Sequence, residues 1–240
     1  MEFEPCHLPK PVAAWAHTPA LKESCGTTLI AVEYADGVLL GADSRTSMGT
    51  FVSGRVSDKL TPVTEHVFVC RSGSSADTQA ITDIVKYRVD ILRWQEGRMP
   101  TVERTAQLFR QYCYDYRDSL SASVLVCGWD KQLGGQVYSI PIGGFVSRQR
   151  SAASGSGSSF VHGFLDSQWK PNMSEQEAET FVLNAVTLAM HRDGSSGGVC
   201  RLGALTEAGM KRKIFTLDSV EHQLPKLLLP EPYGNVPVEV

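Results

Sequence analysis

Near its beginning the chain reads Gly26-Thr27-Thr28-Leu29-Ile30-Ala31-Val32-Glu33-Tyr34, in which two threonines stand directly before an apolar run. An apolar run of this length behind a glycine is typical of a buried strand. A threonine hydroxyl needs a general base if it is to attack a carbonyl at neutral pH. If the chain is cut after Gly26, Thr27 gains such a base in its own new α-amine, and the start of the strand becomes a candidate hydrolase site.

Residues further along the chain supply the other groups that such a site needs. Asp43 lies in Gly41-Ala42-Asp43-Ser44-Arg45, Lys59 in Ser57-Asp58-Lys59-Leu60, and Gly73 in Ser72-Gly73-Ser74. An ammonium near the Thr27 hydroxyl would stabilise its alkoxide, and a carboxylate beside the lysine would keep it charged. The Gly73 N–H, between a strand and a helix, could stabilise an oxyanion. Taken singly, Lys59 fits a solvated surface lysine better and Asp43 fits a turn-capping acid, so only their combination indicates a site.

The composition excludes several classes of function. The chain has 240 residues, 42% hydrophobic and 20% charged, as globular proteins do. A net charge of −3 gives no reason to expect a nucleic acid or a membrane surface as partner, and no apolar stretch approaches the ~20 residues that span a bilayer. The six cysteines form no C-x-x-C pair and the six histidines have no metal-ligand spacing. We therefore expect free buried thiols, no metal and no cofactor.

The order of the expected elements indicates the fold class. Strands grouped in hairpins, with helices grouped elsewhere, predict an α+β protein with two antiparallel sheets face to face and helices outside each. Strands are expected at 28–34, 38–43, 67–71, 122–129, 136–141, 199–206 and 213–217, and helices at 76–94, at 102–118 and from the capping box Ser174-Glu175-Gln176-Glu177 onward.

The two ends of the chain are expected to lie outside this domain. Residues 1–26 lack the apolar segment of a secretory signal and are interpreted as a leader that is removed on maturation. The hydrolase domain then covers residues 27–218. The proline-containing residues 219–240 form an extended tail, either disordered or gripping a neighbouring subunit.

Six motifs taken together resemble those of proteasome core-particle β subunits, in the N-terminal-nucleophile hydrolase family. The resemblance covers residues 26–217 and includes Gly155-Ser156-Gly157-Ser158-Ser159 and Arg192-Asp193-Gly194-Ser195-Ser196-Gly197-Gly198 besides the motifs above. It implies a four-layer αββα sandwich and a precursor that cleaves itself between Gly26 and Thr27.

The same resemblance implies a role for each residue of the candidate site. Thr27 matches the catalytic nucleophile and Gly73 the oxyanion N–H, and the remaining catalytic positions match Asp43, Lys59, Ser156, Asp193 and Ser196. Arg71 occupies the specificity-pocket position and resembles the caspase-like subunit, which cuts after acidic residues. Thr46, Ser57 and Gln79 are expected to contact the substrate as well.

The resulting hypothesis is a threonine endopeptidase that degrades unfolded polypeptides without a cofactor, in the cytoplasm and nucleus. It would work in a stacked-ring assembly with other proteasome α and β subunits. Two alternatives are a non-catalytic structural β subunit that is never self-processed, and a stand-alone amidase for small amides with a pocket closed within one chain.

Overall fold

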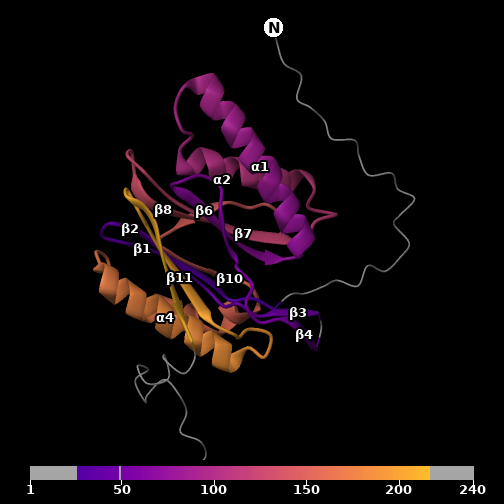
Figure 1. Ribbon diagram of the computed structural model, residues 1–240, viewed down its shortest axis with the longest axis vertical. Coiled ribbons are helices and arrows are strands. Elements are labelled where there is room, and N and C mark those ends of the chain that lie inside the picture. The colour runs from indigo at the N-terminus through magenta and orange to yellow at the C-terminus, as the bar shows by residue number, and fades with distance from the viewer. Residues whose placement is uncertain (1–25, 49, 217–240) are drawn as a thin grey trace, which may run out of the picture.

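The chain folds into two facing antiparallel sheets that lie between two layers of helices (Figure 1). The computed structural model describes residues 26–48 and 50–216. One sheet has the strand order β10-β1-β2-β11-β12, and its strands are β1 (Leu29–Tyr34), β2 (Gly37–Ala42), β10 (Ser151–Ser154), β11 (Cys200–Thr206) and β12 (Gly209–Phe215). The other has the order β5-β6-β7-β8-β9, with β5 (Leu60–Pro62), β6 (Val67–Gly73), β7 (Ala122–Asp130), β8 (Gly134–Ile140) and β9 (Ser147–Gln149).

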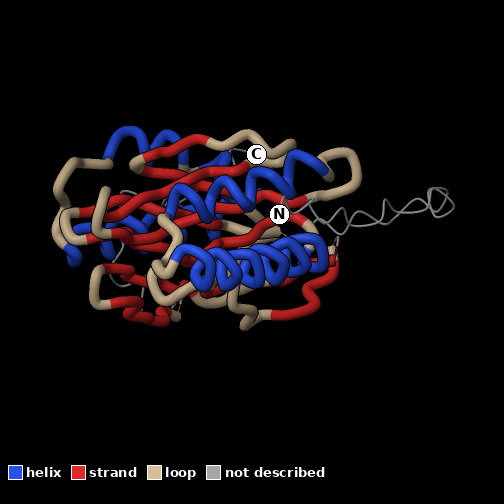
Figure 2. Tube along the Cα trace, turned by 90° about the horizontal axis from the view of Figure 1, so that it is seen from above, coloured by secondary structure: helices blue, strands red, loops and turns tan. Residues whose placement is uncertain are grey.

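Helices cover the outer face of each sheet, as the two views in Figures 1 and 2 show. The helices α1 (Ser75–Glu96) and α2 (Val102–Asp115) pack on the sheet that contains β6 and β7. The helices α3 (His162–Gln168) and α4 (Glu175–Arg192) pack on the sheet that contains β1 and β2. A short hairpin of β3 (Thr46–Met48) and β4 (Phe51–Gly54) and a 3-10 helix, η2 (Ser156–Phe160), lie beside these layers. The predicted αββα sandwich is therefore confirmed.

Both faces of β1 are buried over Leu29–Val32, which explains why these four positions are all apolar. Ile30 and Val32 belong to the core against α4, while Leu29 and Ala31 belong to the core between the two sheets. Successive side chains of a strand point to opposite faces, so a strand in the middle of a four-layer sandwich needs apolar residues at every position.

The helix signals in the sequence correspond to the helices of the structure. In α4 the Ser174 side chain accepts from the Glu177 N–H while the Glu177 side chain accepts from the Ser174 N–H, the predicted capping box. Ser74 caps the start of α1, which continues two residues beyond its expected end at 94 and has Gly97 as its C-cap. Some predicted boundaries were wrong: α2 ends at Asp115 and not at 118, β8 begins at Gly134 and not at 136, and β12 begins at Gly209 and not at 213.

Several short elements were not predicted from the sequence. The hairpin β3–β4, the strands β5, β9 and β10, and α3 are each at most seven residues long. In β10, Ser151-Ala152-Ala153-Ser154 contains no β-branched or aromatic residue, so its strand conformation comes from pairing with β1 and not from local preference. The predicted leader and the tail from residue 219 lie outside the described residues.

Strand register brings distant segments together at one end of the first sheet. Leu29 pairs with Ser154 of β10 and with Ala42 of β2, and Ala42 pairs with Arg201 of β11. The segments that flank these strand ends, at 26–28, 43–45, 155–158 and 193–199, therefore meet. They carry most of the candidate catalytic residues.

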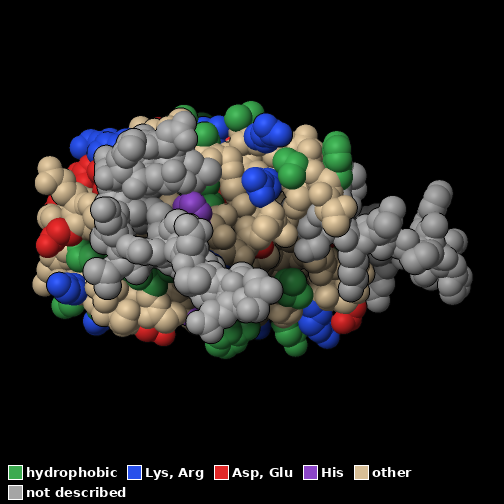
Figure 3. Space-filling model, turned by 90° about the horizontal axis from the view of Figure 1, so that it is seen from below, with side chains coloured by type: hydrophobic (Ala, Val, Ile, Leu, Met, Phe, Trp, Pro, Cys, Tyr) green, Lys and Arg blue, Asp and Glu red, His purple; other side chains and the backbone are tan. Residues whose placement is uncertain are grey.

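Charges of both signs are mixed on one face of the molecule (Figure 3). Figure 3 shows the face on the side of α4, where Lys and Arg side chains are interspersed with Asp and Glu side chains. Within residues 26–48 and 50–216, no helix is both long enough and apolar enough to cross a membrane.

Candidate active site

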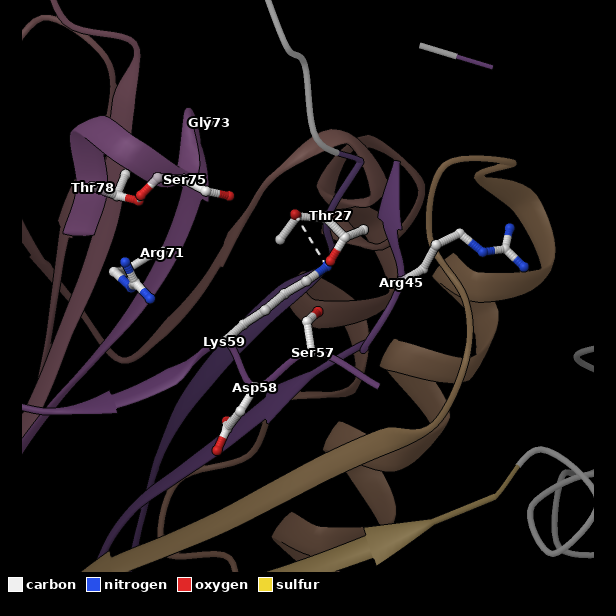
Figure 4. A pocket seen from close by; sticks show the side chains of 10 residues that line it. Thr27, Arg45, Ser57, Asp58, Lys59, Arg71, Gly73, Ser75 and Thr78 are labelled. Carbon is white, nitrogen blue, oxygen red and sulfur yellow. Dashed lines mark hydrogen bonds between the residues drawn. The ribbon is translucent and has the colours of Figure 1, made fainter. Parts of the chain in front are cut away.

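The candidate nucleophile Thr27 lies at the entrance to β1, almost completely buried (Figure 4). Its hydroxyl Oγ1 lies 3.1 Å from Lys59 Nζ and donates to the carbonyl oxygen of Gly26 at 2.7 Å. Lys59 Nζ also lies 3.3 Å from that carbonyl oxygen. The hydroxyl and the ammonium thus converge on the peptide bond that joins Gly26 to Thr27.

A buried ion pair holds Lys59 in this position. Its Nζ lies 2.6 Å from Asp43 Oδ1, and the Asp43 side chain is wholly inaccessible to solvent. The Asp43 carboxylate also accepts backbone N–H groups, from Thr28 at Oδ1 and from Arg45 and Gly197 at Oδ2. A buried carboxylate is tolerated when it is paired and hydrogen-bonded, so these donors hold the Asp43 side chain in position.

A second charged group, Asp193, is connected to Thr27 by hydrogen bonds through Ser156. Ser156 and Ser196 each donate to Asp193 Oδ2 at 2.6 Å, and the Ser195 N–H donates to Oδ1 at 3.0 Å. The Thr27 N–H donates to Ser156 Oγ at 3.1 Å. Burial alone would raise the pKa of Asp193, but the hydrogen bonds from the serines and the nearby Lys59 lower it below its ordinary value, so the group is a carboxylate at neutral pH.

Gly73 faces Thr27 across a small cavity. It ends β6 with φ of +100°, in the left-handed region that glycine adopts without strain, and α1 begins two residues later. The cavity has a volume of about 140 Å³ and is lined by Thr27, Arg45, Thr46, Ser57, Asp58, Lys59, Arg71, Gly73, Ser75 and Thr78. The predicted substrate contacts Arg71, Thr46 and Ser57 are therefore brought together with the nucleophile.

Arg71 forms the wall of the cavity opposite Thr27 in Figure 4. Its Nε donates to Thr61 Oγ1 at 3.1 Å, which fixes the plane of the guanidinium. Burial lowers the pKa of Arg71, and Asp83 and Asp58 act in the opposite direction. A half-buried guanidinium in the same cavity as the nucleophile suits an acidic side chain of a substrate.

One predicted substrate contact, Gln79, lies away from the cavity, and Arg45 lines the cavity without pointing at the nucleophile. Gln79 is exposed on α1 and is not among the residues that line the cavity. Arg45 extends away from Thr27 in Figure 4, and its Nη1 donates to the carbonyl oxygen of Gly194 at 2.9 Å. This hydrogen bond links Arg45 to the loop that follows Asp193.

Sequence reasoning missed several residues of the site. Ser75 and Thr78 line the cavity from the first turn of α1, and their i, i+3 spacing directly after Gly73 was a usable signal. Ser47 accepts from the Gly26 N–H at 3.1 Å, but nothing in the sequence marks it, because its position depends on the hairpin β3–β4. Among the described residues, no group of three or more His, Cys, Asp or Glu side chains is placed to hold a metal ion.

Comparison with known proteins assigns the family. A model of the proteasome subunit family matches residues 23–205. The chain belongs to the proteasome subunit family. A probable proteasome subunit beta type-1 of Schizosaccharomyces pombe is 49% identical over 81% of this chain and 86% of its own length. A proteasome subunit beta type-6 of Dictyostelium discoideum is 47% identical over 79% of this chain and 89% of its own, and proteasome subunit beta type-1 of Saccharomyces cerevisiae is 46% identical over 82% and 92%.

These similarities confirm the predicted family, its N-terminal-nucleophile hydrolase fold and the predicted enzyme class, a threonine endopeptidase of the β1 type. As a proteasome subunit, the chain assembles with other proteasome subunits.

Proposed function

We propose that this proteasome subunit is made as a precursor, cleaves itself between Gly26 and Thr27, and then cuts polypeptides after acidic residues with Thr27 as nucleophile. The observation that carries the proposal is the position of Lys59 Nζ, which lies 3.1 Å from Thr27 Oγ1 and 2.6 Å from Asp43 Oδ1. An ammonium held at this place stabilises negative charge on the threonine oxygen as the hydroxyl loses its proton.

Self-cleavage begins from the arrangement around the intact peptide bond. Thr27 Oγ1 attacks the Gly26 carbonyl carbon, a C–O bond forms, and Lys59 stabilises the oxygen that takes up the charge. The proton that leaves the Thr27 hydroxyl is transferred to the Thr27 nitrogen as the C–N bond breaks, so the acyl group moves from nitrogen to oxygen with no net change in protons. Water then hydrolyses the resulting ester. Residues 1–26 leave as the predicted propeptide and Thr27 becomes the N-terminus.

The freed α-amine is the general base of turnover. Ser156, which accepts from the Thr27 nitrogen, and the carboxylate of Asp193 behind it hold this amine in place. The amine takes the hydroxyl proton as Thr27 Oγ1 attacks the scissile carbonyl, and the Gly73 N–H and Lys59 stabilise the oxyanion. The leaving amine of the substrate departs with a proton, and water hydrolyses the acyl-enzyme.

Arg71 determines which substrates are cut. Its guanidinium lines the cavity beside the nucleophile, together with Thr46 and Ser57. An Asp or Glu side chain before the scissile bond would form charge-assisted hydrogen bonds there, whereas Lys or Arg would be repelled.

The other parts of the hypothesis follow the family. The subunit works in a stacked-ring assembly of α and β subunits on unfolded polypeptides, in the cytoplasm and nucleus. Its hydrolase domain covers residues 27–218, and residues 219–240 follow it in the sequence. The complete set of catalytic side chains is the reason to prefer this function over a structural β subunit that is never processed.

The proposal is tested on assembled particles that contain either the wild-type chain or Thr27→Ala. Reporter peptides that end in Asp, Leu or Arg are supplied to both. We expect Thr27→Ala to abolish hydrolysis after Asp while any cleavage by other subunits is unchanged. Hydrolysis after Asp that persists in the Thr27→Ala particle contradicts the proposed role of Thr27.

A further inference from the structure

Thr28, the residue after the nucleophile, connects the two charged groups of the site. Its backbone N–H donates to Asp43 Oδ1 at 2.9 Å, the same oxygen that pairs with Lys59. Its side-chain Oγ1 lies 2.8 Å from Ser196 Oγ, and Ser196 in turn donates to Asp193. Thr28 therefore contacts the Asp43–Lys59 pair through its backbone and the Asp193 network through its hydroxyl.

The direction of the hydrogen bond between Thr28 and Ser196 follows from counting protons. Asp193 is a carboxylate and can only accept, so the single hydroxyl proton of Ser196 is used in the bond to Oδ2. Ser196 Oγ must then accept from the Thr28 hydroxyl. The result is a directed chain from Thr28 through Ser196 to Asp193, which also accepts from Ser156.

The surroundings of Thr28 fix its hydroxyl in this role. Thr28 is wholly buried. A Cβ added at Gly157 would overlap Thr28 Oγ1, and the Gly157 N–H donates to the carbonyl oxygen of Thr27 at 3.2 Å. Hydrogen bonds in such a chain polarise one another in a buried setting, so the first donor influences the last acceptor.

We propose that Thr28 is a positioning residue for catalysis: its hydroxyl orients Ser196 and Asp193, which align Ser156 with the nitrogen of Thr27. This inference rests on the proposed function, because it assumes that this nitrogen is the general base. Thr28 does not touch the reacting atoms, and it acts on the reaction only through the two serines and the two aspartates.

Packing is the competing explanation, and it makes the opposite prediction for a pair of variants. Thr28→Val keeps the shape and β-branching but removes the hydroxyl, whereas Thr28→Ser keeps the hydroxyl and removes a methyl group. If Thr28 only fills space, Val preserves activity and Ser reduces it. If the hydroxyl positions Asp193, Ser preserves activity and Val reduces it.

The experiment measures kcat and KM for a reporter peptide that ends in Asp, in assembled particles carrying each variant. Thr187→Val is the matched control, since Thr187 is also buried but its hydroxyl donates only to the Leu183 carbonyl oxygen of its own helix at 2.8 Å. We expect Thr28→Val to lower kcat about tenfold to a hundredfold with little change in KM, the range expected for losing a hydrogen bond in a network with a charged group. Thr28→Ser and Thr187→Val should stay within about twofold of wild type.

A variant that fails to remove its propeptide would be inactive for that reason alone. Each variant is therefore also produced with a cleavable carrier protein fused directly before Thr27, so that removal of the carrier makes Thr27 the N-terminal residue. The inference is overturned if Thr28→Val keeps the wild-type kcat when its chain begins at Thr27, or if Thr28→Ser loses as much activity as Thr28→Val. A Thr27→Ala particle is measured in parallel. Full activity there would refute the proposed function itself, whereas loss there with normal Thr28→Val activity refutes only the role of Thr28.

Discussion

Lys59 Nζ lies 2.6 Å from Asp43 Oδ1, in a pair that is almost entirely removed from solvent. The pair joins two segments that follow different strands, since Asp43 comes directly after β2 and Lys59 directly before β5. It thereby ties the end of one sheet to the end of the other. The hydroxyl of Thr27 lies where these two sheet ends meet, at 3.1 Å from the ammonium.

Replacing Lys59 should therefore remove hydrolysis. Lys59→Ala takes away the charge that stabilises the threonine oxygen, and Lys59→Arg should also fail because a planar guanidinium does not fit the place of a compact ammonium. We expect turnover of a reporter peptide to fall by ~10²–10⁴. Lys131→Ala, in an exposed turn after β7, is the control and should behave as wild type. Near-normal turnover of Lys59→Ala would show that Lys59 does not stabilise the threonine oxygen during catalysis.

Arg71→Leu should change the specificity of the subunit. Without the guanidinium the cavity loses its preference for an acidic side chain and becomes suited to an apolar one. Turnover that depends on Thr27 is obtained by subtracting the rate of the Thr27→Ala particle for peptides ending in Asp, Leu and Arg. The preference should move from Asp toward Leu, while Arg104→Leu, on the exposed face of α2, leaves it unchanged. The same preference in Arg71→Leu and wild type would remove Arg71 from the specificity pocket.

Gly26→Ala should slow self-cleavage. Gly26 packs directly against Ser195, so an added Cβ would overlap the Ser195 side chain and backbone and displace the scissile carbonyl from Thr27. The fraction of subunit that begins at Thr27 is measured by intact mass during assembly. Gly163→Ala is a suitable control because a Cβ there meets nothing within 4 Å.

Turnover separates this effect from general damage to the site. Gly26 leaves with the propeptide, so Gly26→Ala particles that do mature should cut peptides at the wild-type rate. Maturation of Gly26→Ala at the wild-type rate would show that the contact with Ser195 does not position the scissile bond.

The isolated chain should be an inactive precursor. Large apolar side chains of the β3–β4 region are exposed, Phe51 at 68% and Val56 at 71%, close in the chain to the cavity-lining residues Thr46 and Ser57. A neighbouring subunit would cover them and complete the walls of the site. Size-exclusion chromatography should find Thr27-dependent activity only in high-mass fractions. Such activity at the monomer position would show that the site is complete without a neighbouring subunit.

Much of the fold could be predicted from the sequence because the signals for its helices and strands are local. The buried run 29–34 and the capping box at Ser174 each depend on a few neighbouring residues, and each corresponds to an element of the structure. The strand β10 was missed because its sequence has no strand preference, and only its register against β1 makes it a strand.

The residues of the candidate site could be predicted from the sequence for a different reason. Motifs that resemble a known family marked Thr27, Asp43, Lys59 and Asp193, but sequence could not reveal what connects them. The contacts of Thr28 with both Asp43 and Ser196, and of Gly26 with Ser195, arise from strand register between segments about 15 to 170 residues apart. Such contacts are properties of the folded chain and have no local pattern.

The intact mass of the subunit in the assembled particle tests the central claim most directly. We expect the wild-type chain to begin at Thr27, having lost residues 1–26, and the Thr27→Ala chain to keep residues that precede position 27. Any shortening of the Thr27→Ala chain by a neighbouring active subunit is identified by repeating the measurement with that subunit inactivated. A Thr27→Ala chain that still begins at position 27 when the neighbours are inactive would contradict the assignment of Thr27 as the nucleophile.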